Sequence, residues 1–401
     1  MRPIVLIISI FLFSNPCISS EDNAYKSFIS ETIRAGHRNI GLIEKKDTLY
    51  ITYWPIGFRD DYEAFKDIRR RVIYYYEQKK ENRSKTIELV QTSWGIPIIK
   101  ANIEYEEAGS NDRFTNVFKA YPSEGLGKNH YKSRKFFVLL DIPLAMKFGG
   151  LQDPFVFKTG IRPDFRFWVH PGVIAYSQVD LYVHNEFDPK MWYKPADMGL
   201  MVAHPLSEKI LSITNVGSFT HKNIYGIDEE IKFSFFDGDF SLGLHLGLYG
   251  DIWFNDNRFK YTGLNKKLEI ASLTWSYWRY DCSLKLKGGR FLNGDKGAGI
   301  EISRVFYEVE IGFSGIYSGN EFNGYIDFSI PLFPKSRRSL ASNGIAFVRN
   351  LRYSYRYNSK GISHDPNETE KGVEPEVGIS FREIEGLARP VHFRHMYRLV
   401  D

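Results

Sequence analysis

The chain of 401 residues carries a formal net charge of +5, spread along its length without a basic block. This distribution argues against a nucleic-acid partner, because nucleic-acid-binding proteins gather positive charge on one face or stripe. Only two cysteines occur, Cys17 and Cys282, so the mature chain cannot build a disulfide framework. Aromatic residues make up 16% of the chain, an excess that suits a β protein with aromatic girdles at a membrane interface.

Residues 1–20 have the layout of a cleaved secretory signal. Arg2 precedes an apolar run of ten residues, and small residues follow at Ser19 and Ser20. We predict cleavage after one of these serines. Lipid attachment at Cys17 is the less favoured alternative, because the preceding Ser-Asn-Pro is a poor lipoprotein motif. No later stretch has 18 consecutive apolar residues, so the sequence predicts no transmembrane helix.

Residues 40–108 predict a small α+β module with the element order β-α-β-β. A short strand over Leu49–Tyr53 precedes a helical pattern that begins with Asp60 as its N-cap. Two further strands follow, over Thr86–Thr92 and Ile96–Glu104.

Residues 113–401 predict a β-barrel domain, because strand-length segments with a period of two follow one another without a convincing amphipathic helix. After a hairpin turn at Asp237-Gly238, the segment Phe240–Tyr249 places one Phe and four Leu on one face. Small or polar residues occupy the other face, so the apolar stripe has the length of a tilted membrane-spanning strand. We expect a mainly β fold, an antiparallel outer-membrane barrel of roughly 12–16 strands.

The expected strands of this domain include two short ones near its start and two at its end. The short ones cover Phe155–Ile161 and Asp164–His170, and the last two cover Glu376–Phe381 and Val391–Leu399.

The local sequence pattern does not decide whether the apolar faces of the strands point inward or outward. A soluble sandwich turns aromatic residues inward and carboxylates outward, whereas a barrel in lipid does the reverse. Charged residues on strand faces are costly in a sheet core but acceptable in a wet lumen. We therefore expect a lumenal charge network made of Arg290, Asp295, Glu301, Arg304, Glu308, Glu310, Asp327, Arg352 and Arg356. The simpler interpretation of the glycine-rich stretch that begins at Gly289 is a strand–turn–strand junction.

Catalytic and cofactor motifs are absent from the sequence. It contains no GxSxG elbow, no HExxH and no phosphate-binding loop. His392 and His395 are three residues apart, so on a strand they face opposite sides and are not expected to share a metal. We expect a non-enzymatic protein without a cofactor or a metal.

The stretch from Gly289 to Phe306, G-R-F-L-N-G-D-K-G-A-G-I-E-I-S-R-V-F, resembles the signature of the YjbH/GfcD family of exopolysaccharide and capsule proteins. Phe322 to Leu332 is similar to a second family motif. Further similar pieces are W-P-I-G-F-R-D-D-Y-E-A-F and W-G-I-P-I in the module, and Asp153-Pro154-Phe155, Pro171-Gly172 and Asn185-Glu186-Phe187-Asp188 in the barrel. The matching signature positions are Gly289, Arg290, Leu292, Gly294, Asp295, Gly297, Glu301, Ser303, Arg304 and Phe306.

The resemblance implies an outer-membrane barrel, surrounded by outer-membrane lipid, that serves export or assembly of an extracellular polysaccharide. The module would then lie in the periplasm and dock other proteins of the exopolysaccharide system. Family members are longer, and this chain is similar mainly to their C-terminal half, which implies a smaller barrel or one that a second chain completes. The alternative is a structural or adhesive outer-membrane barrel without a transport role, its lumen filled by side chains.

Overall fold

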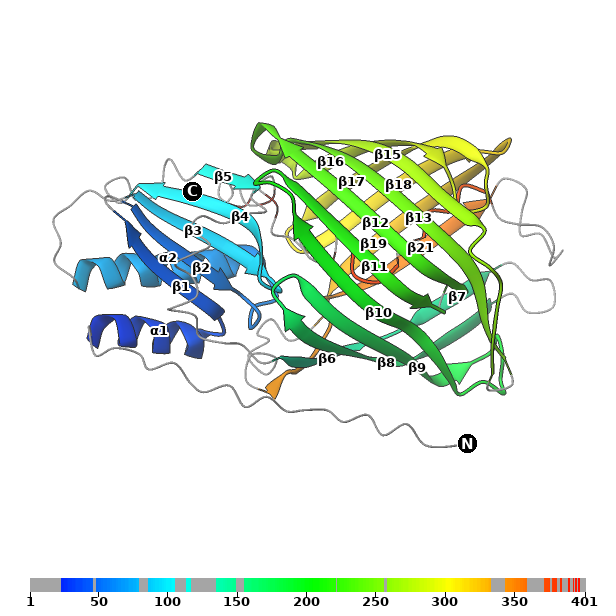
Figure 1. Ribbon diagram of the computed structural model, residues 1–401, viewed down its shortest axis with the longest axis horizontal. Coiled ribbons are helices and arrows are strands. Elements are labelled where there is room, and N and C mark those ends of the chain that lie inside the picture. The colour runs from blue at the N-terminus through cyan, green and yellow to red at the C-terminus, as the bar shows by residue number, and fades with distance from the viewer. Residues whose placement is uncertain are drawn as a thin grey trace.

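The computed structural model describes residues 23–45, 48–78, 86–104, 113–116, 135–148, 155–220, 222–255, 258–332, 343–358, 371–375 and 377–380, with Glu383, Arg389, His392, Arg394 and Met396. The expected signal segment and Cys17 lie outside these residues. An α+β module lies at one end of a large curved sheet (Figure 1). Neither of the two described helices has the length and apolar character that a membrane span requires.

The module contains α1 (Asn23–Ala35), β1 (Arg38–Lys45), β2 (Thr48–Trp54), α2 (Asp61–Gln78), β3 (Thr86–Ser93), β4 (Ile96–Glu104) and β5 (Arg113–Asn116). Its sheet has the order β1-β2-β3-β4-β5, and only β2 and β3 are parallel, because α2 connects them. The backbone N–H of Tyr62 donates to Asp60 Oδ1 at 2.8 Å, as expected for the N-cap of α2. The module is wider than the predicted range 40–108, since α1, β1 and β5 extend it on both sides.

The larger sheet consists of β6 (Phe136–Asp141), β7 (Leu144–Phe148), β8 (Phe155–His170), β9 (Val173–Asn185), β10 (Tyr193–Pro205), β11 (Ile210–Phe219), β12 (Ile224–Phe235), β13 (Phe240–Asn255), β14 (Arg258–Tyr261), β15 (Lys266–Tyr277), β16 (Cys282–Arg290), β17 (Lys296–Phe306), β18 (Val309–Ser318), β19 (Glu321–Pro331), β20 (Ile345–Phe347) and β21 (Asn350–Asn358). The predicted mainly β, antiparallel fold is confirmed, and the 16 strands fall within the predicted range. The two short strands expected over Phe155–Ile161 and Asp164–His170 form one continuous strand, β8.

The sheet curls round so that its first and last strands approach each other, but no continuous ladder joins them in the described part of the chain. β21 pairs with β19 on one side only, and β6 and β7 both pair with β8. The short β20 bridges the gap by pairing in parallel with β6, and Val348 N donates to Leu140 O at 2.9 Å. Since β20 leads into β21 after two residues, the seam is held at the end near the module.

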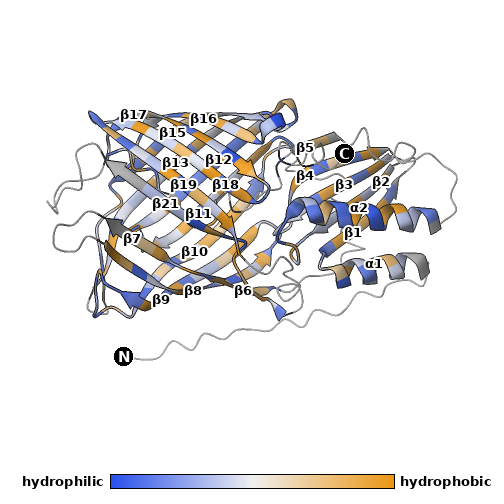
Figure 2. Ribbon diagram, turned by 180° about the vertical axis from the view of Figure 1, so that it is seen from behind, coloured by the Kyte–Doolittle hydropathy of each residue, from blue (hydrophilic) through white to orange (hydrophobic). Residues whose placement is uncertain are grey.

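The barrel strands alternate between apolar and polar residues (Figure 2), and their apolar side chains are exposed on the outer face. Among the described residues, every exposed large hydrophobic side chain except Tyr74 belongs to the barrel. On β13, Leu242, Leu244 and Leu246 are 39–49% exposed, while the alternate positions turn inward. A soluble protein buries such a stripe, so this is the face that a barrel presents to lipid.

Aromatic side chains gather at both ends of this apolar band. Near the module, ring contacts link neighbouring strands through Phe233, Phe235, Phe240, Trp275, Tyr277 and Tyr280. At the other end, rings meet in the pairs Tyr225–Tyr261, Tyr193–Phe254 and Phe254–Phe259. Two aromatic girdles that flank an aliphatic band are the arrangement expected at the two interfaces of a bilayer.

The module is fastened to the barrel by polar and aromatic contacts. Arg59 pairs with Glu308 and donates to the carbonyl oxygen of Leu332 at 2.8 Å. Arg349 Nη1 lies 2.7 Å from Asp61 Oδ2.

Two turns also meet at this junction. Gly172 N, between β8 and β9, donates to Trp94 O in the β3–β4 turn at 3.0 Å. The ring of Trp54 packs against Trp168 at a centroid distance of 5.5 Å. The turn at Trp94-Gly95 and the turn at Pro171-Gly172 thus contact each other.

Placing a charge in the aliphatic band tests its orientation toward lipid. We expect Leu246→Arg to destabilise the inserted barrel by about 2–4 kcal/mol, because Leu246 lies on the outer face of β13 between the girdle residues Phe240 and Phe254, close to the middle of the band. Leu242→Arg is the matched control. It lies next to the girdle residues Phe240 and Trp275, so its cost should fall to about 0–1 kcal/mol. Equal effects of both substitutions on urea-induced unfolding in lipid vesicles would contradict the assignment.

The module contains a buried histidine that makes its stability depend on pH. Burial lowers the pKa of His37, whose Nε2 lies 3.1 Å from Asp67 Oδ2. Burial alone would raise the pKa of Asp67, but hydrogen bonds from His37 and Arg71 outweigh it and hold that pKa below its usual range. As the pH falls below about 6.5, the unfolded chain binds a proton that the folded module does not, so folding is weakened.

We therefore expect the free energy of unfolding of the module to decrease between pH 7.5 and 5.5, by at most about 1.4 kcal/mol per pH unit. The tryptophan fluorescence of Trp54 and Trp94 reports this transition in a urea titration. His37→Gln should flatten the pH dependence. A wild-type module that is equally stable at both pH values would refute the account.

Candidate lumenal site

The described residues between Lys371 and Met396 lie inside the barrel and contact its lumenal wall. At the end far from the module, Gly372 N donates to Asp295 Oδ2 at 2.7 Å, and Leu292 N donates to Val373 O at 3.1 Å. These two wall residues belong to the turn between β16 and β17. The glycine-rich stretch is therefore a strand–turn–strand junction, and its turn holds the start of an internal segment, which we call the plug.

Halfway along the barrel the plug packs closely against β11. Asn215 Nδ2 donates to Ile379 O at 3.3 Å, and Ile379 N donates to Asn215 Oδ1 at 3.1 Å, so one side chain satisfies both backbone groups. Gly378 has a φ of +59°, and a Cβ atom there would lie 2.4 Å from Asn215 Oδ1 and 2.6 Å from Tyr176 Oη. Only glycine fits this position without displacing the segment.

Toward the module the plug is held by ion pairs. Glu383 pairs with Arg166, which also pairs with Asp164 of the same strand at 2.5 Å. Arg389 Nη1 lies 3.8 Å from Glu310 Oε1.

Two further pairs hold the last described residues of the plug. His392 pairs with Asp281, and Arg394 pairs with Asp239. The partners Asp281 and Asp239 lie in turns at the module end, so the plug passes through the whole lumen.

The prediction of strands over Glu376–Phe381 and Val391–Leu399 is wrong for the described residues, which belong to the plug. The described residues in these ranges form no strand. Val377 and Ile379 are buried and alternate with the half-buried Gly378 and Ser380, which mimics the period of a strand. Of the two histidines considered together, His392 is buried against Asp281, and His395 lies outside the described residues.

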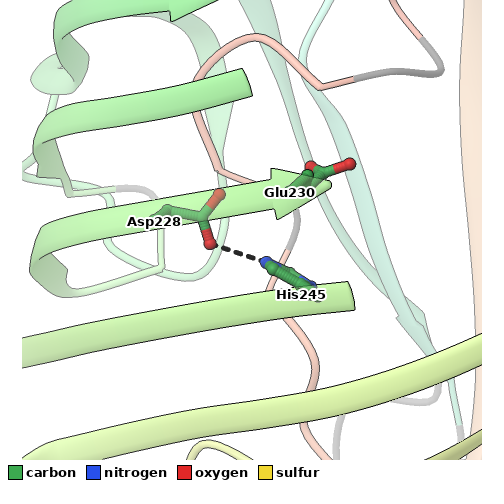
Figure 3. A group of neighbouring side chains, drawn as sticks. All are labelled: Asp228, Glu230 and His245. Atoms are coloured by element: carbon green, nitrogen blue, oxygen red, sulfur yellow. Dashed lines mark hydrogen bonds and ion pairs between the residues drawn. The ribbon is translucent and has the colours of Figure 1, made fainter. Parts of the chain in front are cut away.

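A cluster of metal-ligating side chains lies where the plug passes β12 and β13 (Figure 3). Asp228 and Glu230 stand two residues apart on β12, and His245 faces Glu230 across the ladder to β13. His245 Nε2 lies 2.6 Å from Asp228 Oδ2, and Nδ1 lies 3.1 Å from Glu374 Oε1 of the plug. Glu374 is held in turn by Lys287 of β16 at 2.7 Å.

A cavity of about 640 Å³ extends along the lumen beside the plug, from the junction with the module, where Trp54 and Arg59 line it, to the far end of the barrel, where Lys194 and Lys222 line it. Arg162 and Asp180, 2.5 Å apart, line it together with Lys158 and Lys194. The rings of Trp54 and Tyr182 also line it, and Asp141–Ala145 and Arg352 bring both edges of the seam to it. Its size is that of a small-molecule site, and its walls offer both charged groups and aromatic surface.

The structure distributes the nine predicted charges over several places. Asp295 holds the plug and accepts from Ser318, and Glu310 pairs with Arg389 of the plug. Asp327 accepts from Ser354 on the lumenal face of β19. Arg352 lines the cavity.

Two more of these charges lie on the two strands that the β16–β17 turn joins. Arg290 and Glu301 are partly buried on β16 and β17. Arg290 Nε has no hydrogen-bond partner among the described residues.

The remaining three predicted residues have no described place in the lumen. Arg304 does not face the lumen: it shares the outer face of β17 with Ile302 and Phe306, and its guanidinium lies 4.4 Å from the Phe306 ring centroid. Residues 301 and 304 cannot share a face, because they are an odd number of positions apart. Glu308 lies at the module junction rather than in the lumen, and the side chain of Arg356 is not described.

Sequence reasoning missed Asp228, Glu230, His245 and Glu374. The pattern Asp-x-Glu on one strand of a predicted hairpin, with a histidine on the next, was an available signal for the first three. The contact with Glu374 joins positions 129 residues apart, and nothing in the local sequence indicates it.

Comparisons with known proteins add little. No family model matches the chain, and no curated protein matches it. One solved structure, the outer membrane channel DcaP of Acinetobacter baumannii, aligns with 8% identity and a TM-score of 0.30, over 56% of this chain and 96% of the channel.

Substituting Gly378 tests whether the plug closes the lumen. We expect Gly378→Val to unseat the plug and raise ion conductance across a planar bilayer toward that of a chain ending at residue 370, because a side chain there collides with Asn215 and Tyr176. Gly263→Val is the control, since a Cβ at Gly263 meets nothing within 4 Å. If neither Gly378→Val nor the truncation raises conductance, the plug does not occlude the barrel.

Proposed function

We propose that this chain is an outer-membrane β-barrel that takes part in the export or assembly of an extracellular polysaccharide, without enzymatic activity. The observation that carries this proposal is the charged and aromatic cavity that runs from the module along the lumen of a barrel with a lipid-facing exterior. Sugar hydroxyls are bound by charged and amide groups, and sugar rings stack on aromatic faces, so the lining suits a saccharide.

The residues that resemble the exopolysaccharide family support the proposal by their positions. Trp94 and Gly172 join the module to the barrel, as Arg59 and Leu332 do. Asp295 of the signature turn holds the plug. The resembling residues therefore occupy the contacts that couple module, barrel and plug, and a partner bound to the module would act on the cavity through them.

A second candidate function is a structural or adhesive barrel without transport. The plug favours it, since the described residues from Lys371 to Met396 occupy the lumen along its length. Export by this chain requires either that the plug moves or that the polymer is handled in the cavity alone.

A deletion strain separates the two candidates. We expect loss of surface polysaccharide, restored by the wild-type chain. The double variant Lys194→Gln with Arg352→Gln should restore several-fold less polymer at an equal level of folded barrel, because both side chains line the cavity. Lys190→Gln, in the exposed β9–β10 turn, is the matched control and should restore polymer fully.

Normal surface polysaccharide in the deletion strain, measured by a carbohydrate-specific stain, would refute a role in export or assembly. In that case the second candidate, a structural or adhesive barrel, is the function that stands. Recovery of the chain in the soluble periplasmic fraction would refute both candidates.

A further inference from the structure

Three side chains with the chemistry of a transition-metal site converge on the lumenal wall beside the plug. One carboxylate oxygen of Asp228, one of Glu230 and one ring nitrogen of His245 all lie within 4.8 Å of one another. Two carboxylates and an imidazole form a donor set that Zn²⁺ and similar divalent ions accept. Figure 3 shows that the residues come from two strands, so the sheet itself fixes their relative positions.

The burial of Asp228 is an independent sign that a ligand belongs here. The residue is 0% exposed, and its Oδ1 has no hydrogen-bond partner in the part of the chain that the structure describes. Its other oxygen already accepts from Tyr249 and lies 2.6 Å from His245 Nε2. A buried carboxylate oxygen without a partner is unfavourable, and a bound cation would remove that cost.

We propose that Asp228, Glu230 and His245 bind one divalent transition-metal ion, with Zn²⁺ as its model, at the contact between barrel wall and plug. Ligand atoms around tetrahedral Zn²⁺ lie about 3.4 Å apart at metal distances of about 2.1 Å, so separations of no more than 4.8 Å need only small side-chain movements for binding. The Nε2 proton of His245 is displaced to solvent or to a carboxylate as the metal–nitrogen bond forms.

Glu374 acts in this site as a positioning residue. A metal-bound histidine usually donates its second ring N–H to a carboxylate, which fixes the ring. Nδ1 of His245 lies 3.1 Å from Glu374 Oε1, and Lys287 holds the other oxygen of Glu374 at 2.7 Å. Because Glu374 belongs to the plug, the metal links the plug to the wall. This inference is independent of the polysaccharide proposal.

The test uses the full chain, purified in detergent and stripped with a chelator. Equilibrium dialysis against Zn²⁺ with elemental analysis should give one ion per chain, and Co²⁺ should give the visible absorption of a low-coordinate complex. Asp228→Asn and His245→Gln should each abolish stoichiometric uptake. Glu374→Gln should keep the stoichiometry but weaken affinity about 10–100-fold, as loss of a carboxylate that orients a ligand does.

The control variants are Asp281→Asn and His392→Gln. These residues form a second buried histidine–carboxylate pair between wall and plug, without further residues around it that complete a metal-ligating group in the described structure. They should leave uptake unchanged, and heat-modifiable gel migration shows that each variant is folded. A wild-type chain that binds no Zn²⁺ and gives no Co²⁺ spectrum would overturn the proposal. So would equal loss of uptake in the Asp228 and Asp281 variants.

Discussion

The plug is held by polar side chains that the sheet has to turn inward. A strand has two faces, and a face in contact with lipid carries charge only at high cost, so the acids and bases of the barrel strands gather on the lumenal face. There Arg166, Asp228 and Asn215 are buried and need partners. In the plug, Glu383 pairs with Arg166, and the backbone of Ile379 hydrogen-bonds with Asn215. Glu374 of the plug pairs with His245, which lies beside Asp228. The apolar exterior and the occupied interior follow from the same constraint.

The alternation of the barrel strands was predictable because it is a local property. Leu242, Leu244 and Leu246 follow one another at a period of two, and any strand through them has one apolar face. The same rule places Phe313 outside and Asp327 inside, and the structure confirms both. The prediction for Arg304 was wrong because it grouped this residue with Glu301 by charge. Arg304 is two positions from Ile302 and therefore shares its lipid-facing side of β17.

The plug could not be predicted from the same information. Val377 and Ile379 alternate like a strand, yet the backbone of Ile379 is satisfied by Asn215, a partner 164 residues away in sequence. A hydrophobic period of two shows that a segment is extended and half-buried. It does not show whether the segment pairs with a strand of the sheet or lies inside the barrel. Of the metal-ligating cluster, only the contact with Glu374 shares this limit, because the predicted β12–β13 hairpin is what sets His245 opposite Glu230.

The most direct measurement is disulfide trapping between wall and plug in intact outer membranes. Asn215→Cys and Ile379→Cys, in a chain with Cys282→Ser, should crosslink rapidly under mild oxidation, because Asn215 contacts the backbone of residue 379. The crosslink would appear as a shift in gel mobility that a reductant reverses. Failure to crosslink in membrane-inserted protein, while both thiols react with a small maleimide, would contradict a plugged barrel.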